Sequence, residues 1–324
     1  MRRRGTAGRM IATVVGVLSM IIAGAALAIR YAPLPTQPLV FASVAAPFLA
    51  IAAPVALVVL SLARRWALSA VAAILTVITI AVQVPLYVAD PPPESSVTVR
   101  VMTINMLYGR ANAASIVATA SRQADVLMVQ ELTPEALRRL QQAGVDRAFP
   151  HHAIEPRPMA AGAGIFSRHP ISGSAPISGL QRAMVTTRLE IDGVRTDPIV
   201  AAVHLDSPWP RPIEGWHRDF DAFPGVLTTL AAQAGGGSVI IAGDFNATVD
   251  MRPFRRLLKD GYRDASEQAG AGRQFTFPSN RRFPPVMGLD HVLTRNATGV
   301  STATITIPGT DHRALVATVL VPRG

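Results

Sequence analysis

Eight polar residues in the C-terminal two thirds of the sequence carry groups that could perform hydrolytic chemistry. Each stands at or just beyond the start or end of a short apolar run of strand character: Asn105, Glu131, His204, Asp244, Asn246, Asp290, Asp311 and His312. A sheet fixes the positions of its strand ends, and for this reason loops at such ends often carry chemistry. The sequence therefore predicts one oxygen-rich site that also contains histidine.

The oxygen-bearing members of this set favour a hard divalent cation. Glu131, Asp311 and the Asn105 amide offer the ligands that Mg²⁺ or Mn²⁺ prefers, with water in the remaining positions. A zinc site would need clustered histidines or cysteines, and the chain has no cysteine and no His-x-x-x-His. The histidines supply proton transfer or phosphate contacts, and a carboxylate such as that of Asp290 can hold an imidazole in its useful tautomer.

Alternating strands and helices must position these residues. Strand character is present at residues 97–105, 124–131, 163–171, 183–206 (a hairpin that turns at Asp192–Gly193), 238–246, 289–295 and 310–321. Helices are expected at residues 111–123, 133–144 and 214–234. Strands outnumber helices and partly form hairpins, which indicates layered sheets rather than a doubly wound parallel sheet.

In their order and spacing, the segments TIN, QE, VHL, GDFN, LDHV and TDHRAL resemble the endonuclease/exonuclease/phosphatase superfamily over residues 97–321. The resemblance implies a four-layer α/β sandwich with two central mixed sheets flanked by helices. It also implies metal-dependent hydrolysis of a phosphoester by in-line attack of water. Leu107 stands where some relatives carry an acidic residue, and no tyrosine lies between Glu131 and His204, so features of certain nucleases are missing.

The resemblance also implies a role for each residue of the set. It implies metal binding by Glu131, Asn105 and Asp311; alignment or deprotonation of water by Asp244; phosphate binding by Asn246 and His204; and a carboxylate–imidazole pair of Asp290 and His312. The other five histidines receive no role, and strand alternation points His291 away from Asp290.

The N-terminal region, residues 1–89, predicts three transmembrane helices. Its uncharged runs cover residues 10–29, 39–63 and 66–88, each long enough to cross a hydrocarbon core of roughly 30 Å. Arginines precede the first run and lie at Arg64 and Arg65 between the second and third, so the positive-inside rule places these parts in the cytoplasm. The multi-pass anchor would then deliver the rest of the chain outside the cell membrane. The segment GAALA leaves open cleavage of the first run by a signal peptidase.

A proline-rich linker at residues 90–96 precedes the expected catalytic domain of residues 97–324. The formal net charge of +10 belongs mostly to the N-terminal region, because 24 basic and 21 acidic residues remain from Asp90 onward. So small an excess of basic over acidic residues does not indicate a nucleic-acid-binding surface, so the phosphoester substrate can be a phospholipid or a nucleic acid. No obligate protein partner is evident. The alternative is a non-catalytic binding module of a membrane complex on the same fold.

Overall fold

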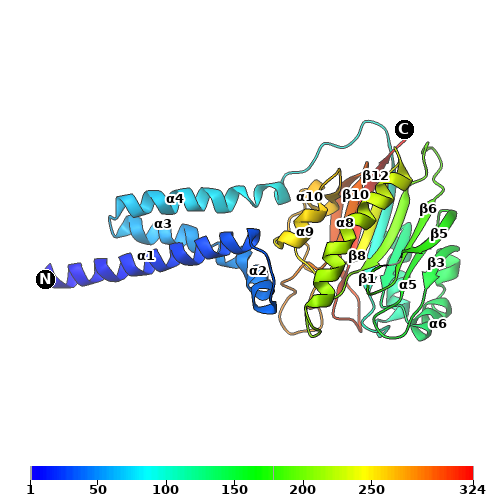
Figure 1. Ribbon diagram of the computed structural model, residues 1–324, viewed down its shortest axis with the longest axis horizontal. Coiled ribbons are helices and arrows are strands. Elements are labelled where there is room, and N and C mark those ends of the chain that lie inside the picture. Colours follow the sequence, from blue (N-terminus) through cyan, green and yellow to red (C-terminus); the bar gives the residue numbers. More distant parts are fainter. Residues whose placement is uncertain (1, 178, 324) are drawn as a thin grey trace. The chain divides into compact units, whose positions relative to one another are not determined.

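The computed structural model describes residues 2–177 and 179–323. The chain forms two compact units, which we call the helical unit (Met1–Pro85 with Val249–Arg252) and the α/β unit (Leu86–Thr248 with Pro253–Gly324). Figure 1 shows their elements.

Two six-stranded mixed sheets form the centre of the α/β unit. The first has the order β11-β12-β1-β2-β4-β3, with β1 Ser96–Asn105, β2 Val126–Gln130, β3 His151–Glu155, β4 Ala163–Ser167, β11 Thr298–Thr306 and β12 Arg313–Pro322. The second has the order β5-β6-β7-β8-β10-β9, with β5 Ile171–Ile177, β6 Met184–Leu189, β7 Ile199–His204, β8 Val239–Asp244, β9 Arg263–Asp264 and β10 Asp290–Arg295. In each sheet one neighbouring pair, β1 with β2 or β7 with β8, is parallel.

Helices cover the outer faces of the two sheets. The helices outside the N-terminal region are α5 Ala113–Gln123, α6 Pro134–Gln142, α7 Val145–Ala148, α8 Glu214–Ala234, α9 Arg252–Leu257 and α10 Ala265–Gln268. Thr133 begins α6 by accepting a hydrogen bond from the Ala136 backbone N–H at 3.1 Å, with Pro134 at the first helical position.

Alternation along the strands separates two hydrophobic layers. Val101 points into the core between the sheets, whereas its neighbour Met102 points to the outer face, where α5 and α6 pack. On the other sheet, Phe223 of α8 meets Phe245, which follows β8, ring edge to ring face. The predicted pair of mixed sheets flanked by helices is thereby confirmed.

The predicted three spanning helices need correction. Among the described residues, only α1 (Arg2–Tyr31) contains a single straight segment, Ala7–Tyr31, long and apolar enough to cross a membrane. The second run is broken into α2 (Gln37–Leu49) and α3 (Ala52–Leu62), which bend by 51°, and they pass the same test only when taken together. The third run yields α4 (Trp66–Ala81), a helix of 16 residues, before the short 3₁₀ helix η1 (Val84–Tyr87).

Proline explains both departures. Pro54 lies in the first turn of α3 and has no N–H to donate to the carbonyl of Ala50 at the bend, and Pro85 stands in the same relation to Ala81, the last residue of α4. Charge-free length alone therefore overestimated the number of unbroken helices.

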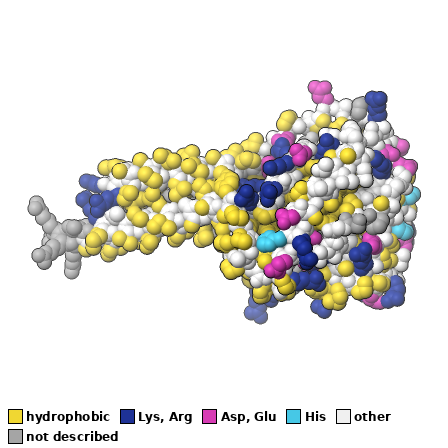
Figure 2. All heavy atoms as spheres, in the orientation of Figure 1, with side chains coloured by type: hydrophobic (Ala, Val, Ile, Leu, Met, Phe, Trp, Pro, Cys, Tyr) yellow, Lys and Arg dark blue, Asp and Glu magenta, His cyan; other side chains and the backbone are white. Residues whose placement is uncertain are grey.

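Large apolar side chains cover the outside of the helical unit. Figure 2 shows them along the visible face of the helices, and exposed examples include Ile21, Val58, Leu62 and Ile74. The helices pack on one another through a small interior in which Gly16 lets the Leu60 side chain approach α1 closely.

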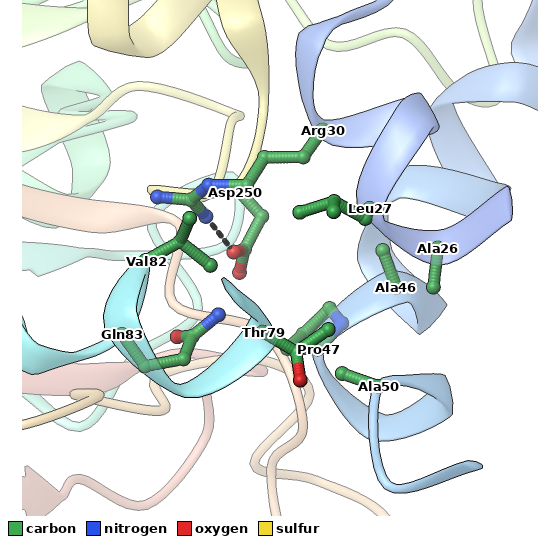
Figure 3. A pocket seen from close by; sticks show the side chains of 10 residues that line it. All are labelled: Ala26, Leu27, Arg30, Ala46, Pro47, Ala50, Thr79, Val82, Gln83 and Asp250. Carbon is green, nitrogen blue, oxygen red and sulfur yellow. Dashed lines mark hydrogen bonds and ion pairs between the residues drawn. The ribbon is translucent and has the colours of Figure 1, made fainter. Parts of the chain in front are cut away.

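The segment Val249–Arg252 belongs to the helical unit. The Asp250 carboxylate accepts a hydrogen bond from the Arg30 guanidinium of α1, and both side chains are largely buried. Figure 3 shows this ion pair in a pocket that is otherwise lined mainly by small apolar side chains of α1 and α2 and by the end of the third run.

Candidate active site

Strand register brings the sequence-predicted residues to one edge of the two sheets, which we call the site edge. Asn105 at the end of β1 lies beside Gln130, and Glu131 follows directly. In the second sheet His204 at the end of β7 lies beside Asp244, the last residue of β8. β10 runs antiparallel to β8 and begins at Asp290, opposite the same aspartate.

Asp244 is the residue on which the others converge. Its Oδ2 accepts a hydrogen bond from Asn105 Nδ2 at 3.0 Å and lies 3.5 Å from His204 Nε2 and 3.7 Å from His312 Nε2. Its Oδ1 accepts from the Asn246 backbone N–H at 2.8 Å. The side chain is 1% exposed, and burial together with the charge of Asp290 raises its pKa to about 6, against the opposing effect of His312.

Asp290 and His312 form a buried carboxylate–imidazole pair. Asp290 Oδ2 lies 2.7 Å from His312 Nδ1, which leaves Nε2 directed toward Asp244. Burial alone would lower the pKa of His312, but the charges of Asp290 and Asp244 and the hydrogen bond to Asp290 outweigh it and raise the pKa to about 10. His312 is therefore a cation at neutral pH, and its Nε2–H faces the Asp244 carboxylate.

Glu131 occupies a left-handed backbone position, with φ of 58°, immediately after β2. This turn directs its carboxylate to the site, where Oε1 accepts from Asn105 Nδ2 at 3.2 Å and Oε2 accepts from the Tyr108 backbone N–H. The Asn105 amide oxygen accepts from the Leu107 N–H at 2.9 Å, so a ligand role for that oxygen requires the amide to turn over.

Asp311 is placed differently from the rest of the set. The residue is half-exposed, its backbone carbonyl accepts from the Ser279 N–H at 2.7 Å, and its charge contributes to the raised pKa of His312. None of the hydrogen bonds and ion pairs described above for the other site residues involves its carboxylate.

The donor set fits a divalent cation. The carboxylates of Glu131 and Asp244 share the Asn105 amide as a common donor. Asp290 Oδ1 is buried without a hydrogen-bond partner among the described residues, an orphan of the kind that an ion or water satisfies. Ligand atoms of Asp244, Asp290 and His312 also lie within 4.8 Å of one another, a grouping that differs from the predicted ligands. A protonated His312 opposes cation binding in that second arrangement.

Arg182, just before β6, is a site residue that the sequence did not reveal. It is 7% exposed, its Nη1 lies 3.0 Å from His204 Nδ1 and 3.8 Å from Glu131 Oε1, and its Nη2 donates to Asp206 Oδ1 at 3.0 Å. Burial, followed by the charge of Arg182, lowers the pKa of His204 well below its usual value, so His204 is neutral. The only sequence signal for Arg182 is a cation at the start of an apolar strand.

Asn246 completes the turn after β8. Its backbone is left-handed, with φ of 49°, its Nδ2 donates to the Leu205 carbonyl at 2.9 Å, and its own carbonyl accepts from Trp216 Nε1 at 3.0 Å. His291, the neighbour of Asp290, faces elsewhere and pairs with Asp264 at 2.7 Å.

Two mixed sheets with helices outside, and a site of buried carboxylates, histidines and amides at their common edge, define an α/β sandwich of the phosphoesterase type. The chain belongs to the Endonuclease/Exonuclease/phosphatase family, whose model matches residues 102–312. The family predicted from the sequence motifs is thereby confirmed. No curated protein matches the chain in a sequence search.

Solved structures share this fold at low sequence identity. TDP2 of D. rerio, humanized by 14 mutations, has a TM-score of 0.56 and 18% identity over 68% of this chain and 98% of its own. D. rerio TDP2 complexed with single-strand DNA product has a TM-score of 0.55 and 19% identity over the same shares of the two chains. An endonuclease/exonuclease/phosphatase from Beutenbergia cavernae has a TM-score of 0.53 and 18% identity, covering 69% of this chain and 72% of its own.

Proposed function

We propose that the protein is a metal-dependent phosphoesterase that hydrolyses phosphodiester or phosphomonoester bonds at the site edge. The observation that carries the proposal is the environment of Asp244: a buried carboxylate with a pKa raised to about 6, flanked by two histidines and an amide. A carboxylate of raised pKa is a stronger base than an ordinary aspartate and still ionised at neutral pH.

The side chains divide the reaction between them. Asp244 aligns a water molecule and accepts its proton as the oxygen attacks phosphorus. His312, held through Nδ1 by Asp290, donates from Nε2 to the phosphate oxygens or to the leaving group. Asn246 and the neutral His204 bind phosphate oxygens, and Arg182 brings a buried positive charge beside His204 that opposes the charge of the phosphate.

Glu131 is the principal residue proposed to hold Mg²⁺ or Mn²⁺, with Asn105 and Asp311 beside it. A bound divalent ion would neutralise phosphate charge and polarise the P–O bond. Binding there needs the Asn105 amide turned over and the half-exposed Asp311 carboxylate drawn in, whereas Glu131 already faces the site.

We further propose that the helical unit anchors the enzyme in the cell membrane, with the N-terminus in the cytoplasm and the α/β unit outside. The exposed apolar surface of the helices supports this, because it needs an apolar solvent. Arg65 Nε donates to Thr13 Oγ1 at 2.9 Å, and Thr13 lies one helical turn from Arg9, so the Arg64–Arg65 turn and the N-terminal part of α1 lie at the same end of the helices, as the positive-inside rule requires of one cytoplasmic end.

Asp244→Ala tests the catalytic proposal. The purified full chain in detergent is given bis(p-nitrophenyl) phosphate, plasmid DNA and phospholipid vesicles, each with Mg²⁺ and with chelator. We expect chelator-sensitive hydrolysis that the variant loses by at least about a hundredfold. Equal activity of both proteins would refute the assignment, provided that circular dichroism shows the variant to be folded.

A further inference from the structure

The distribution of exposed apolar side chains on the α/β unit is uneven. Apart from Tyr87 and Val88, which lie at the start of the unit, four large apolar or aromatic side chains are exposed among its described residues, by 41% to 62%: Tyr108, Met159, Trp209 and Phe283. Each lies in a different loop, at residues 106–112, 156–162, 205–213 and 269–289. All four loops adjoin strand ends at the site edge.

A contact ties each of the first two loops to a site residue or its neighbour. The Tyr108 backbone N–H donates to Glu131 Oε2. The Arg157 N–H donates to the carbonyl of Leu132, which follows Glu131, at 3.1 Å. The two loops therefore border the side of the site that holds the Glu131 carboxylate.

The other two loops border the histidines. Asp206 Oδ1 accepts from Arg182, which contacts His204, and Trp209 follows three residues later. The Phe277 ring lies 5.0 Å from the His312 ring, centroid to centroid, at the start of the stretch that leads to Phe283. The four exposed side chains thus surround one site, and we call them with their loops the rim.

Each rim side chain has an arginine within two residues. The pairs are Tyr108 with Arg110, Met159 with Arg157, Trp209 with Arg211, and Phe283 with Arg282. With Arg273 and Arg281 the four loops contain six arginines, against one acidic residue, the buried Asp206. From Asp90 onward the chain has 24 basic and 21 acidic residues, so 18 basic and 20 acidic residues lie outside the loops. The rim therefore carries the entire positive surplus.

We propose that the rim is a membrane-contacting surface and that the substrate of the proposed reaction is the phosphoester of a lipid headgroup. The inference rests on the proposed function for its substrate, whereas the membrane contact stands independently. Apolar side chains enter the acyl boundary while adjacent arginines meet lipid phosphates, a pairing typical of interfacial proteins. Tyr108 and Trp209 combine an apolar ring with a polar group, as residues at the membrane interface do.

Two observations favour lipid over single-stranded nucleic acid. Nucleic-acid platforms stack bases on aromatic rings, and although three rim side chains are aromatic, Met159, the most exposed of the four, offers no ring to a base. The same chain also carries helices whose exposed apolar surface requires a bilayer, so lipid headgroups are at hand wherever the enzyme is anchored.

The chain contains no cysteine, so a single introduced cysteine can be labelled specifically. Single substitutions Met159→Cys and Phe283→Cys in the full chain are labelled with an environment-sensitive dye and reconstituted into phosphatidylcholine vesicles, with or without phosphatidylglycerol. Asp192→Cys, an exposed position in the turn between β6 and β7 at the opposite edge, is the matched control. A spin label on the lipid acyl chains quenches a dye that enters the membrane.

We expect quenching at the two rim positions to exceed that at position 192 by at least about twofold and to increase with phosphatidylglycerol. Equal quenching at all three positions would overturn the proposal. Protection of the rim dyes from a water-soluble quencher by single-stranded DNA, without lipid quenching, would overturn it in favour of a nucleic-acid surface.

Activity tests the substrate. Wild type and the double variant Met159→Ser/Phe283→Ser are compared on mixed phospholipid vesicles and on bis(p-nitrophenyl) phosphate. We expect the ratio of the two rates to fall at least about tenfold in the variant. Hydrolysis of the soluble diester without release from any vesicle lipid would refute the lipid substrate. Hydrolysis of neither would refute the proposed function instead, while dye quenching would still decide the membrane contact.

Discussion

Replacing Asp290 by Asn probes the proton-bearing pair with almost no change in side-chain shape. The exchange removes the charge that faces His312 and weakens the 2.7 Å hydrogen bond that orients its ring. With Asp290 in place the pKa of His312 is about 10, so the ring is protonated throughout the neutral range. Without it the pKa falls toward the ordinary value of about 6.5.

Two factors give the magnitude of the effect. At about pH 7.5 a histidine of ordinary pKa is protonated in roughly one molecule in ten, a tenfold loss of active enzyme. Loss of a hydrogen bond to a charged group costs about 1.5–3 kcal/mol, or roughly 10- to 150-fold in rate if the bond acts in the transition state. The product is a fall of about 10²- to 10³-fold in kcat/KM at that pH. At about pH 5.5 both proteins carry the proton, and only the second factor remains.

The assay is the pH dependence of kcat/KM for bis(p-nitrophenyl) phosphate with the full chain in detergent. The exchange acts on the pKa of Asp244 in two opposing ways, because the charge of Asp290 raises it and the charge of His312 lowers it, so the ratio of variant to wild type above about pH 7 reports chiefly on His312. Asp264→Asn is the matched control, because Asp264 and His291 form a second buried pair of 2.7 Å that includes the same strand, β10, but lies outside the site. A ratio for Asp290→Asn that stays constant with pH would refute a proton-bearing role for His312.

Three further predictions follow from the same geometry. Glu131→Gln should weaken Mg²⁺ binding at least about tenfold by isothermal titration calorimetry, and an unchanged affinity would remove Glu131 from the ligand set. Gly243→Ala should lower the thermal midpoint and activity together, because a Cβ there would lie 1.9 Å from the Val203 carbonyl oxygen and force β7 from β8, costing about 1–3 kcal/mol; an unaltered midpoint contradicts this. Burial lowers the pKa of His291, but the hydrogen bond to Asp264 opposes burial, and the net effect raises this pKa above its ordinary value. The stability that the His291–Asp264 pair contributes is therefore complete below about pH 6.5 and declines as pH rises through the pKa of His291 in the folded protein. Denaturant midpoints should therefore differ most between wild type and Asp264→Asn at low pH, and a gap that widens with pH would contradict the assigned sign.

The strands that the sequence predicted share one property, their place inside a sheet. Val126–Gln130 and Val239–Asp244 are buried on both faces and read as continuous apolar runs. The strands that the pattern did not identify, β3, β5, β9 and β11, are the four edge strands. In β11 threonines and serine alternate between half-buried and exposed positions, so the apolar signal is weak although the backbone pairs with β12 on both sides of an irregularity between Gly299 and Ser301.

The prediction of three transmembrane helices in the N-terminal region was wrong for a different reason. Hydropathy reports which residues avoid water, and the exposed apolar surface of the helical unit agrees with it. It does not report whether a run remains straight, which depends on local backbone chemistry at Pro54 and Pro85. Composition therefore predicted an apolar region, whereas the number of spans required the positions of the bends.

In the site, too, residues placed by the ends of strands were predictable from the sequence, whereas residues placed by tertiary contacts were not. Asp244 and Asn246 were predictable because strand ends have fixed places, and Gly243 and the left-handed Asn246 let the chain approach β7 and turn there. Arg182 was not predictable, because its role depends on His204 and Asp206, which come from another strand end. Burial lowers the pKa of both histidines; the Arg182 guanidinium lowers that of His204 further, whereas the Asp290 and Asp244 carboxylates raise that of His312. The two histidines thus differ in charge because of partners that folding supplies, and on this difference rests the proposal that His204 binds phosphate as a neutral ring while His312 donates a proton.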